Sequence, residues 1–366
     1  MNLYILLFII PIFISLYEYI CYKFRSEKSL KILTFDGSNE AYHPSVVYDK
    51  KGLFYKPYYL AITPYPIISE IYRDRWECPS IYLSNNGLEW FTLPEIKNPI
   101  DDLSENEISE NSHFSDVHLL INYDKGELEC WYRFNNRSKN NKCEKIFKKV
   151  SKDGITWGER QLIIDVTNEM NKNIFGDTIV SPSIIYENEK YYIWYVNKDK
   201  YHNKRKIIRV VMKENNIILK IEQCVLLNKK CDPWHIDIQI INNIYYLLIY
   251  ELSEQISIWQ SKDGISFNFI KYILKRKSGS YYWNGLYRAC LLADDKDFKI
   301  YFSCNDYKKS RIGVINSKNL ESFNILDIPN GEYKEKYYEY IYYKYVHKNY
   351  IRILNLAHSV KVMVKS

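Results

Sequence analysis

One short peptide occurs several times along the chain, and this repetition constrains the fold more than any other feature. Ser-Lys-Asp-Gly-Ile-Thr-Trp at residues 151–157 returns almost unchanged as Ser-Lys-Asp-Gly-Ile-Ser-Phe at residues 261–267. A degenerate copy occupies residues 84–90 and a weaker one residues 316–323. Asp-Gly or Asn-Gly between two apolar segments is typical of a β-hairpin, and we expect a two-residue type I′ turn in each copy. The repetition predicts an array of similar β units.

The spacing of the copies gives the number of units. The serines that open them are 67, 110 and 56 residues apart, so the middle interval is about twice the last. This predicts a decayed copy near residues 213–216. The array then holds five units of roughly 55 to 70 residues, the size of a four-stranded blade of a β-propeller.

The start of each unit can be located from polarity. Innermost strands of a propeller line its central channel, so their first residues converge at one mouth. Five segments begin with polar residues, continue as apolar runs and are followed by a turn and an aromatic strand; they lie at residues 42–48, 115–120, 180–186, 234–238 and 286–290. We therefore predict an all-β, five-bladed β-propeller over residues 26–330, with residues 30–35 as a possible closing strand.

The two ends of the chain do not belong to the repeat. Residues 3–22 are almost wholly apolar, a length that can span a bilayer, and no basic residue precedes them. We predict a single-pass transmembrane helix within residues 1–25, with a cleaved signal peptide as the alternative. The basic residues all follow this segment, which places the propeller on the cytoplasmic side. Residues 331–366 are predicted to form a C-terminal appendage packed on the propeller.

Charge and cysteine content limit the possible partners. The net charge of +7 is spread along the chain, whereas proteins that bind nucleic acid concentrate basic residues on one face, so we expect no nucleic acid partner. The eight cysteines show neither Cys-x-x-Cys nor the spacing of a zinc site. We expect no cofactor.

Several motifs together resemble a known group of enzymes. His-Pro-Ser-Val-Val-Tyr at 43–48, Glu-Cys-Pro-Ser-Ile at 77–81, the heptapeptide at 151–157 and Trp-His-Ile-Asp at 234–237 resemble the five-bladed propeller glycosidases of families 43, 62 and 32. The resemblance covers about residues 36–325 and implies a protein that acts on glycans.

The same resemblance implies three carboxylates on the inner strands of successive blades. Asp116 matches the second of them. His43 stands where the family has the first, unless Asp36 or Glu40 replaces it from the preceding loop, and Ser181 stands at the third. Glu77 lies in a triplet that looks like the acid-bearing Glu-Cys-Pro of the invertase-like family, although that motif belongs to a later blade.

Glycoside hydrolysis requires two carboxylates across the scissile bond. Asp116 and Asp237 both lie near the starts of inner strands, so we expect them to be the catalytic pair, one as acid and the other as base. His43, His118 and His235 also lie near strand starts. They could hydrogen-bond sugar hydroxyls or, with the two aspartates, ligate a metal. We expect hydrogen bonds to the sugar and predict no metal site.

Other side chains would complete a sugar-binding mouth. Arg133 and Arg288 suit an anionic group because a guanidinium presents several donors in a plane. Trp234 could stack on a sugar ring, as could three further tryptophans that lie beside polar positions, namely Trp76, Trp131 and Trp283. Glu77 and Ser181 complete the predicted binding residues.

These observations favour a membrane-anchored propeller that acts on a polysaccharide or glycoconjugate, by hydrolysis or transfer. The alternative is a propeller that binds a glycan without catalysis, because two of the three expected acidic positions differ. A protein-interaction propeller fits less well, since the predicted mouth is polar and aromatic rather than broadly apolar.

Overall fold

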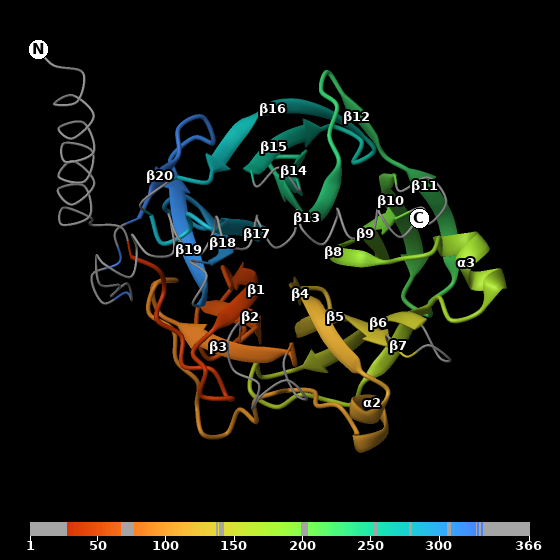
Figure 1. Cartoon of the computed structure of the whole chain (residues 1–366), viewed down its shortest axis with the longest axis horizontal. Coiled ribbons are helices and arrows are strands. Elements are labelled where there is room, and N and C mark those ends of the chain that lie inside the picture. The colour runs from red at the N-terminus through yellow and green to blue at the C-terminus, as the bar shows by residue number, and fades with distance from the viewer. Residues whose placement is uncertain are drawn as a thin grey trace, which may run out of the picture.

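The computed structural model describes residues 28–66, 77–136, 138, 143–198, 204–251, 255–277, 280–305, 309–326, 328 and 331. Within these residues the chain forms five antiparallel sheets arranged around a central axis, which confirms the predicted five-bladed β-propeller (Figure 1). The predicted anchor at residues 1–25, Trp76 and residues 332–366 lie outside the described residues. No helix in the described part of the chain is long and apolar enough to cross a membrane.

Each blade is a meander whose strands follow one another in sequence. Blade 1 contains β1 Ala41–Tyr48, β2 Tyr58–Pro64 and β3 Ser80–Ser84. Blade 2 contains β4 Ser112–Asn122, β5 Glu127–Asn136, β6 Cys143–Ser151 and β7 Gln161–Asp165. Blade 3 contains β8 Val180–Glu187, β9 Lys190–Lys198, β10 Arg205–Lys213 and β11 Ile218–Gln223.

The last two blades follow the same plan. Blade 4 contains β13 Pro233–Ile241, β14 Ile244–Glu251, β15 Gln255–Ser261 and β16 Ser266–Lys275, and β12 Val225–Leu227 adds to its outer edge in parallel. Blade 5 contains β17 Gly285–Ala293, β18 Phe298–Asn305, β19 Ser310–Ser317 and β20 Asn324–Ile325. Two short helices, α2 Glu105–Ser109 and α3 Glu169–Phe175, lie in the loops before β4 and β8.

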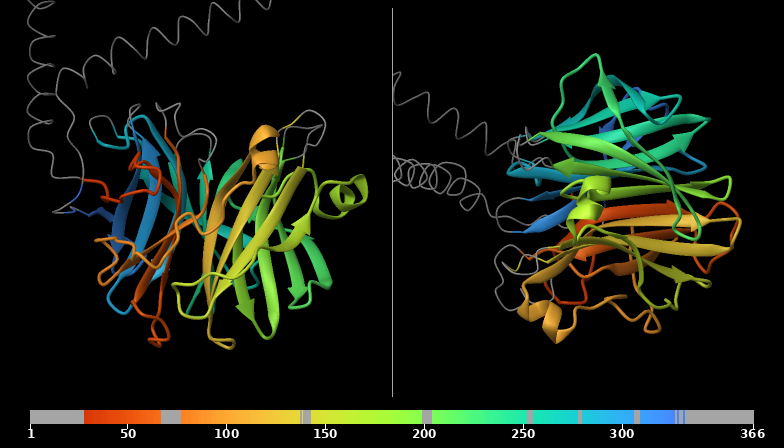
Figure 2. Two further views of the ribbon diagram at one scale, coloured as in Figure 1. Left: turned by 90° about the horizontal axis from the view of Figure 1, so that it is seen from below. Right: turned by 90° about the vertical axis from the view of Figure 1, so that its right-hand side faces the viewer.

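The five segments predicted as inner strands are the first strands of the five blades. β1, β4, β8, β13 and β17 each contact the next, and β17 contacts β1, so they form a closed ring around the channel. Figure 2 shows the blades from the side, with the loops gathered at the two ends of the strands.

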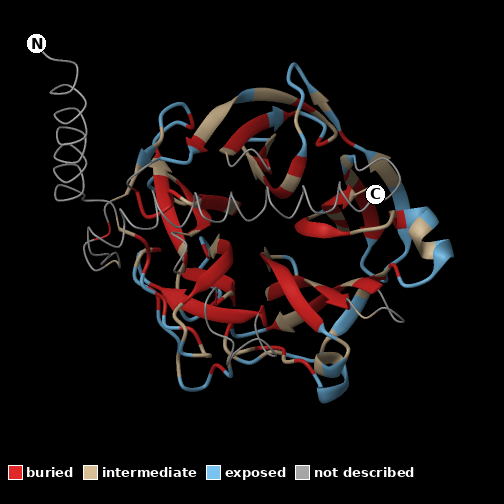
Figure 3. Ribbon diagram, in the orientation of Figure 1, coloured by how far each residue is buried: buried red, intermediate tan, exposed pale blue. Residues whose placement is uncertain are grey.

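Apolar residues hold neighbouring blades together. One buried cluster lies between each pair of adjacent blades; between blades 1 and 2, for example, Tyr59 packs with Phe114 and Tyr132. Burial is concentrated in the strands, while the outer loops are exposed (Figure 3). The stability of the ring therefore resides in the junctions between blades.

The ring closes through the segment before β1. The Leu30 amide donates to the Ile312 carbonyl of β19 at 2.8 Å, and Leu30 and Ile32 pack in the cluster between blades 5 and 1. The predicted closing strand over residues 30–35 is reduced to this single bridge. This short contact takes the place of the predicted strand, and it adds to the packing of β1 on β17 and β18.

The repeated peptide forms a turn at the end of the third strand of a blade. In the copy after β6, the Ser151 hydroxyl accepts from the Gly154 amide at 2.8 Å, and the Asp153 carboxylate accepts from Ile155 and Thr156 at 2.8 and 2.7 Å. Gly154 has a φ of 73°, whereas Asp153 does not have a positive φ. The predicted type I′ turn is wrong, because the serine and aspartate side chains build the turn and only glycine needs the left-handed conformation.

The degenerate copies fold in the same way. Leu320 takes the glycine position of the last copy with a φ of 61°, and its amide donates to the Ser317 hydroxyl. The position predicted for the decayed copy is the turn between β10 and β11, where Asn216 has a φ of 62°. The count of five units from the repeat is therefore confirmed.

Each complete turn also contacts the preceding blade. The Gly264 carbonyl accepts from the Trp194 indole of β9 at 2.9 Å, and the Gly87 carbonyl accepts from the Tyr301 hydroxyl of β18 at 2.8 Å. A Cβ at Gly154 would lie 2.6 Å from the Tyr59 hydroxyl of β2. The glycine is needed for close approach as well as for its conformation.

We expect Gly154→Ala to destabilise the propeller more than Gly126→Ala. Both glycines have positive φ, which costs an alanine about 1–2 kcal/mol, but only at Gly154 would the new Cβ meet another blade; at Gly126 no heavy atom lies within 4 Å. The clash should add about 1–3 kcal/mol to the loss in unfolding free energy, measured by chemical denaturation. Equal losses in the two variants would show that the turn does not fasten the blades.

Candidate functional site

Three residues from three blades meet at the mouth where the inner strands begin. His43 of β1, Asp116 of β4 and His235 of β13 are all buried, and one ligand-type atom from each lies within 4.8 Å of the others. Asp116 Oδ1 lies 3.3 Å from His235 Nδ1 and 3.9 Å from His43 Nε2. The structure therefore brings together two of the predicted histidines and one of the predicted aspartates.

A shared irregularity of the inner strands presents these residues. The pairing of β1, β4 and β8 with the second strand of the blade shifts around residues 43, 116 and 181, which form β-bulges. His43, Asp116 and Ser181 have φ values of 49°, 55° and 56°, a left-handed conformation uncommon for residues other than glycine. A bulge redirects the side chain it carries, and bulges are frequent next to active sites.

The nitrogen and oxygen atoms of this cluster suit a metal ion. The Thr63 hydroxyl lies 2.7 Å from His43 Nδ1, which leaves Nε2 facing Asp116. Within the described residues, Nε2 of His235 has no hydrogen-bond partner, and His235 Nδ1 and Asp116 Oδ1 have no partner beyond their own 3.3 Å contact. Buried polar atoms are normally satisfied, and two imidazoles with one carboxylate are a donor set found around Zn²⁺ and similar ions. The residues present thus fit a metal, against the expectation of none.

Two arginines also approach Asp116. Arg133 Nη1 lies 3.7 Å from Asp116 Oδ2, and the same guanidinium donates twice to Glu144, at 3.1 and 2.6 Å. Arg288 is fully buried, with Nη1 4.0 Å from Asp116 Oδ1 and Nη2 donating to the Pro182 carbonyl at 3.3 Å. Among the described residues, Nε and Nη1 of Arg288 make no hydrogen bond.

The electrostatics of the cluster fix its protonation. Burial raises the pKa of Asp116, but His235, His43 and Arg288 together lower it by more. The net pKa therefore lies well below the usual value. Burial lowers the pKa of His43 to about 3, and it also lowers the pKa of His235. An ionised carboxylate beside neutral imidazoles is the state in which these groups bind a metal.

Asp237 and His118 form a separate pair in the channel. His118 Nε2 donates to the Ile184 carbonyl at 2.9 Å, which leaves Nδ1 3.6 Å from Asp237 Oδ1. Asp237 Oδ2 accepts from the Leu291 amide at 2.9 Å. Burial raises the pKa of Asp237 to about 6. The two aspartates predicted as a pair therefore have different partners and opposite pKa shifts.

The remaining predicted residues surround the mouth or lie in the core. Glu77 Oε2 lies 4.0 Å from His43 Nδ1, and the Ser181 amide donates to Asp116 at 3.2 Å. Trp234 is partly exposed, and its indole donates to the Tyr287 hydroxyl at 3.0 Å. Trp131, in contrast, is fully buried in the cluster between blades 2 and 3, so it cannot stack on a sugar. Trp283 is also buried.

Sequence reasoning missed three residues of the site. These are Thr63, which contacts His43; Glu144, which binds Arg133; and Tyr287, whose ring lies 4.1 Å from that of His235 and stacks on Tyr42 at 5.2 Å. Tyr287 could have been found, because it occupies the bulge of β17, the same place that His43 takes in β1.

We expect the stability of the protein to fall relative to Asp237→Asn as the pH rises from 4 to 7. The folded pKa of about 6 exceeds the ordinary 3.8, so stability from the protonated form is complete below pH 3.8 and is lost as the pH passes 6. The change should reach about 3 kcal/mol. The difference in unfolding free energy between wild type and Asp237→Asn measures it, and a difference independent of pH would contradict the buried, proton-retaining carboxyl.

Comparison with known proteins finds similar solved structures but no related sequence family. No protein-family model matches the chain, and no curated protein matches it. An N-acetylgalactosamine deacetylase from F. plautii, solved with blood group B trisaccharide, superposes with a TM-score of 0.65 at 17% identity, over 81% of this chain and 95% of that one.

Two glycosidases of family 43 give similar matches. A β-xylosidase/α-arabinofuranosidase from a compost microbial metagenome, solved with xylotriose, has a TM-score of 0.55 at 10% identity, over 84% of this chain and 98% of that one. A β-1,3-galactosidase with galactodeoxynojirimycin has a TM-score of 0.58 at 10% identity, over 82% and 99%. The chain is therefore a five-bladed β-propeller that resembles, at low identity, glycoside hydrolases of family 43 and a carbohydrate deacetylase.

Proposed function

We propose that this protein is a metal-dependent hydrolase that removes the acetyl group from an acetamido sugar of a glycan. The observation that carries the proposal is the convergence of His43, Asp116 and His235, whose ligand atoms lie within 4.8 Å of one another. The likeness in fold to the deacetylase and to the family 43 enzymes supports a glycan as the ligand, because those proteins were solved with oligosaccharides or a sugar analogue.

The three ligands have complementary parts in this proposal. His43 and His235 supply neutral nitrogens and Asp116 supplies the charge, while Thr63 holds the His43 ring by its other nitrogen. A divalent ion held there would polarise the acetamide carbonyl and acidify a water molecule. A partner on the distal nitrogen of a ligating histidine fixes the orientation of its ring, so Thr63 is a positioning residue.

Other residues serve the proton transfers and the developing charge. In this proposal Glu77, whose carboxylate lies 4.0 Å from His43 Nδ1, would take a proton from the attacking water and pass it to the leaving nitrogen. The water oxygen adds to the carbonyl carbon and the carbon–nitrogen bond then breaks, which gives acetate and a free amine. Arg288 has donors without partners among the described residues, and these can stabilise the negative oxygen of the tetrahedral intermediate.

Glycoside hydrolysis by Asp116 and Asp237 is the second candidate. It is favoured by their opposite pKa shifts, since an acid with a raised pKa beside an ionised partner is the arrangement glycosidases use. It leaves His43 and His235 without a part, and it requires Asp237 to act although the Leu291 amide and His118 already contact it. The deacetylase proposal gives a role to the His235 nitrogens, and glycoside hydrolysis does not. A propeller that only binds glycans is the third possibility.

The proposal predicts acetate release that depends on metal. The protein should release acetate from N-acetylated oligosaccharides, lose this activity on treatment with a chelator, and regain it when Zn²⁺, Mn²⁺ or Co²⁺ is added. Asp116→Asn and His235→Ala should lower the activity by at least about 100-fold and reduce bound metal measured by elemental analysis.

The same experiment separates the candidates. Lys262→Gln, on an exposed turn of blade 4, serves as the control and should leave acetate release and metal content unchanged. Release of reducing sugar that survives chelation would favour the two-carboxylate mechanism. Metal content that is equal in wild type and His235→Ala would contradict the proposed metal site.

A further inference from the structure

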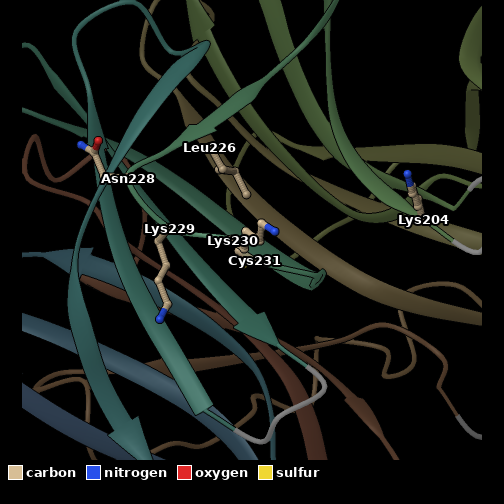
Figure 4. A pocket seen from close by; sticks show the side chains of 6 residues that line it. All are labelled: Lys204, Leu226, Asn228, Lys229, Lys230 and Cys231. Carbon is tan, nitrogen blue, oxygen red and sulfur yellow. The ribbon is translucent and has the colours of Figure 1, made fainter.

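A cavity lies between blades 3 and 4. Its volume is about 680 Å³, and it is lined by Lys204, Leu226, Asn228, Lys229, Lys230 and Cys231 (Figure 4). Figure 4 shows Lys204 on one side and Lys229 and Lys230 on the other. We call it the lysine cavity.

One end of the lysine cavity lies at the end of the blades that carries the candidate site. β10 is antiparallel to β9, which is antiparallel to β8, so Lys204 at the start of β10 lies at the same end as Ser181 near the start of β8. Lys230 and Cys231 lie shortly before β13, the strand that carries His235. Leu226 and Asn228 lie farther along the blade, beside the first residues of β16. Cys231 is four residues from His235, which places them at most about 14 Å apart.

The residues that line the lysine cavity carry positive charge, and the closest acidic influence is Glu251, which interacts with Lys229 and Cys231. No acidic residue lines it, and its three lysines are exposed. None of the three forms an ion pair with a residue in the described part of the chain. The neighbouring Asp232 is instead bound by Arg205. Three like charges around one hollow raise the local concentration of an anionic ligand.

Aromatic contacts connect the lysine cavity to the site. The Arg205 guanidinium lies 4.7 Å from the ring of Trp234, and the Trp234 indole donates to Tyr287. The Tyr287 ring lies 4.1 Å from that of His235. A partly exposed tryptophan between a polar site and a basic hollow is a surface on which a sugar ring can stack.

We propose that the lysine cavity is a subsite for an anionic group, a carboxylate or a sulfate, on a glycan whose acetamido sugar lies at His43, Asp116 and His235. This inference rests on the proposed function in taking that sugar as the reacting unit. The substrate class is then an acidic, N-acetylated oligosaccharide, with the acidic unit held over the start of β10 and the reacting unit at the mouth of the channel.

Binding of three hexasaccharides by calorimetry tests the subsite. Non-sulfated chondroitin offers carboxylates, chondroitin sulfate adds sulfates, and N-acetylchitohexaose is neutral. Wild type should bind one or both anionic probes more tightly than the neutral one. The double variant Lys204→Gln/Lys230→Gln should weaken anionic binding by about 3- to 10-fold, with binding of the neutral probe unchanged within twofold.

Lys262→Gln is the matched control, because it removes an exposed lysine on the turn that ends β15, at the opposite end of blade 4. It should change none of the affinities. The two anionic probes distinguish the preferred group. A larger loss of affinity for chondroitin sulfate in the double variant indicates a sulfate, and an equal loss for non-sulfated chondroitin indicates a carboxylate.

The proposal is overturned if wild type binds neither anionic probe, or if the double variant loses affinity equally for the neutral one. Calorimetry in the presence of chelator reports the subsite without turnover. Anionic binding that depends on the lysines, together with no metal-dependent acetate release, would uphold the subsite and refute the deacetylase proposal.

Discussion

The site depends on the compensation of one buried charge. Asp116 is an ionised carboxylate with almost no exposure, and burying such a group is very unfavourable unless it is paired. Its partners come from every blade: His43 from blade 1, Arg133 from blade 2, the Ser181 amide from blade 3, His235 from blade 4 and Arg288 from blade 5. The position of each blade around the axis is therefore coupled to the state of this single carboxylate.

Much of the fold could be predicted from the repeated turn. Its serine and aspartate form local hydrogen bonds, so the signal survives in sequence, and it located the inner strands and several residues of the mouth. The type of turn was predicted wrongly, because the dipeptide Asp-Gly does not show that the Ser151 and Asp153 side chains replace the backbone bonds of a hairpin. Bulges leave no sequence motif, so the left-handed conformation of His43 and Asp116 was not foreseen.

The chemistry of the site was less predictable than its location. His43, Asp116 and His235 are separated by scores of residues, so no local spacing marks them as a ligand set. Asp116 and Asp237 look alike in sequence, yet one lies among cationic groups and the other beside a neutral imidazole. Burial raises the pKa of both, but the groups around Asp116 bring its pKa well below the usual value, whereas the pKa of Asp237 stays raised. The pKa of a buried aspartate depends on its neighbours in the folded structure, and the local sequence does not show which residues these are.

The bridge from Leu30 to Ile312 has a consequence for how the chain folds. It joins residues 282 positions apart, but the entropy of closing a loop grows only with the logarithm of its length, so doubling the loop adds about 0.6 kcal/mol. Contacts between distant residues nevertheless slow the search for the native state. The segment before β1 must wait until blade 5 exists before it can pair. A contact that forms this late acts on the rate at which the ring opens more than on the rate at which the chain folds.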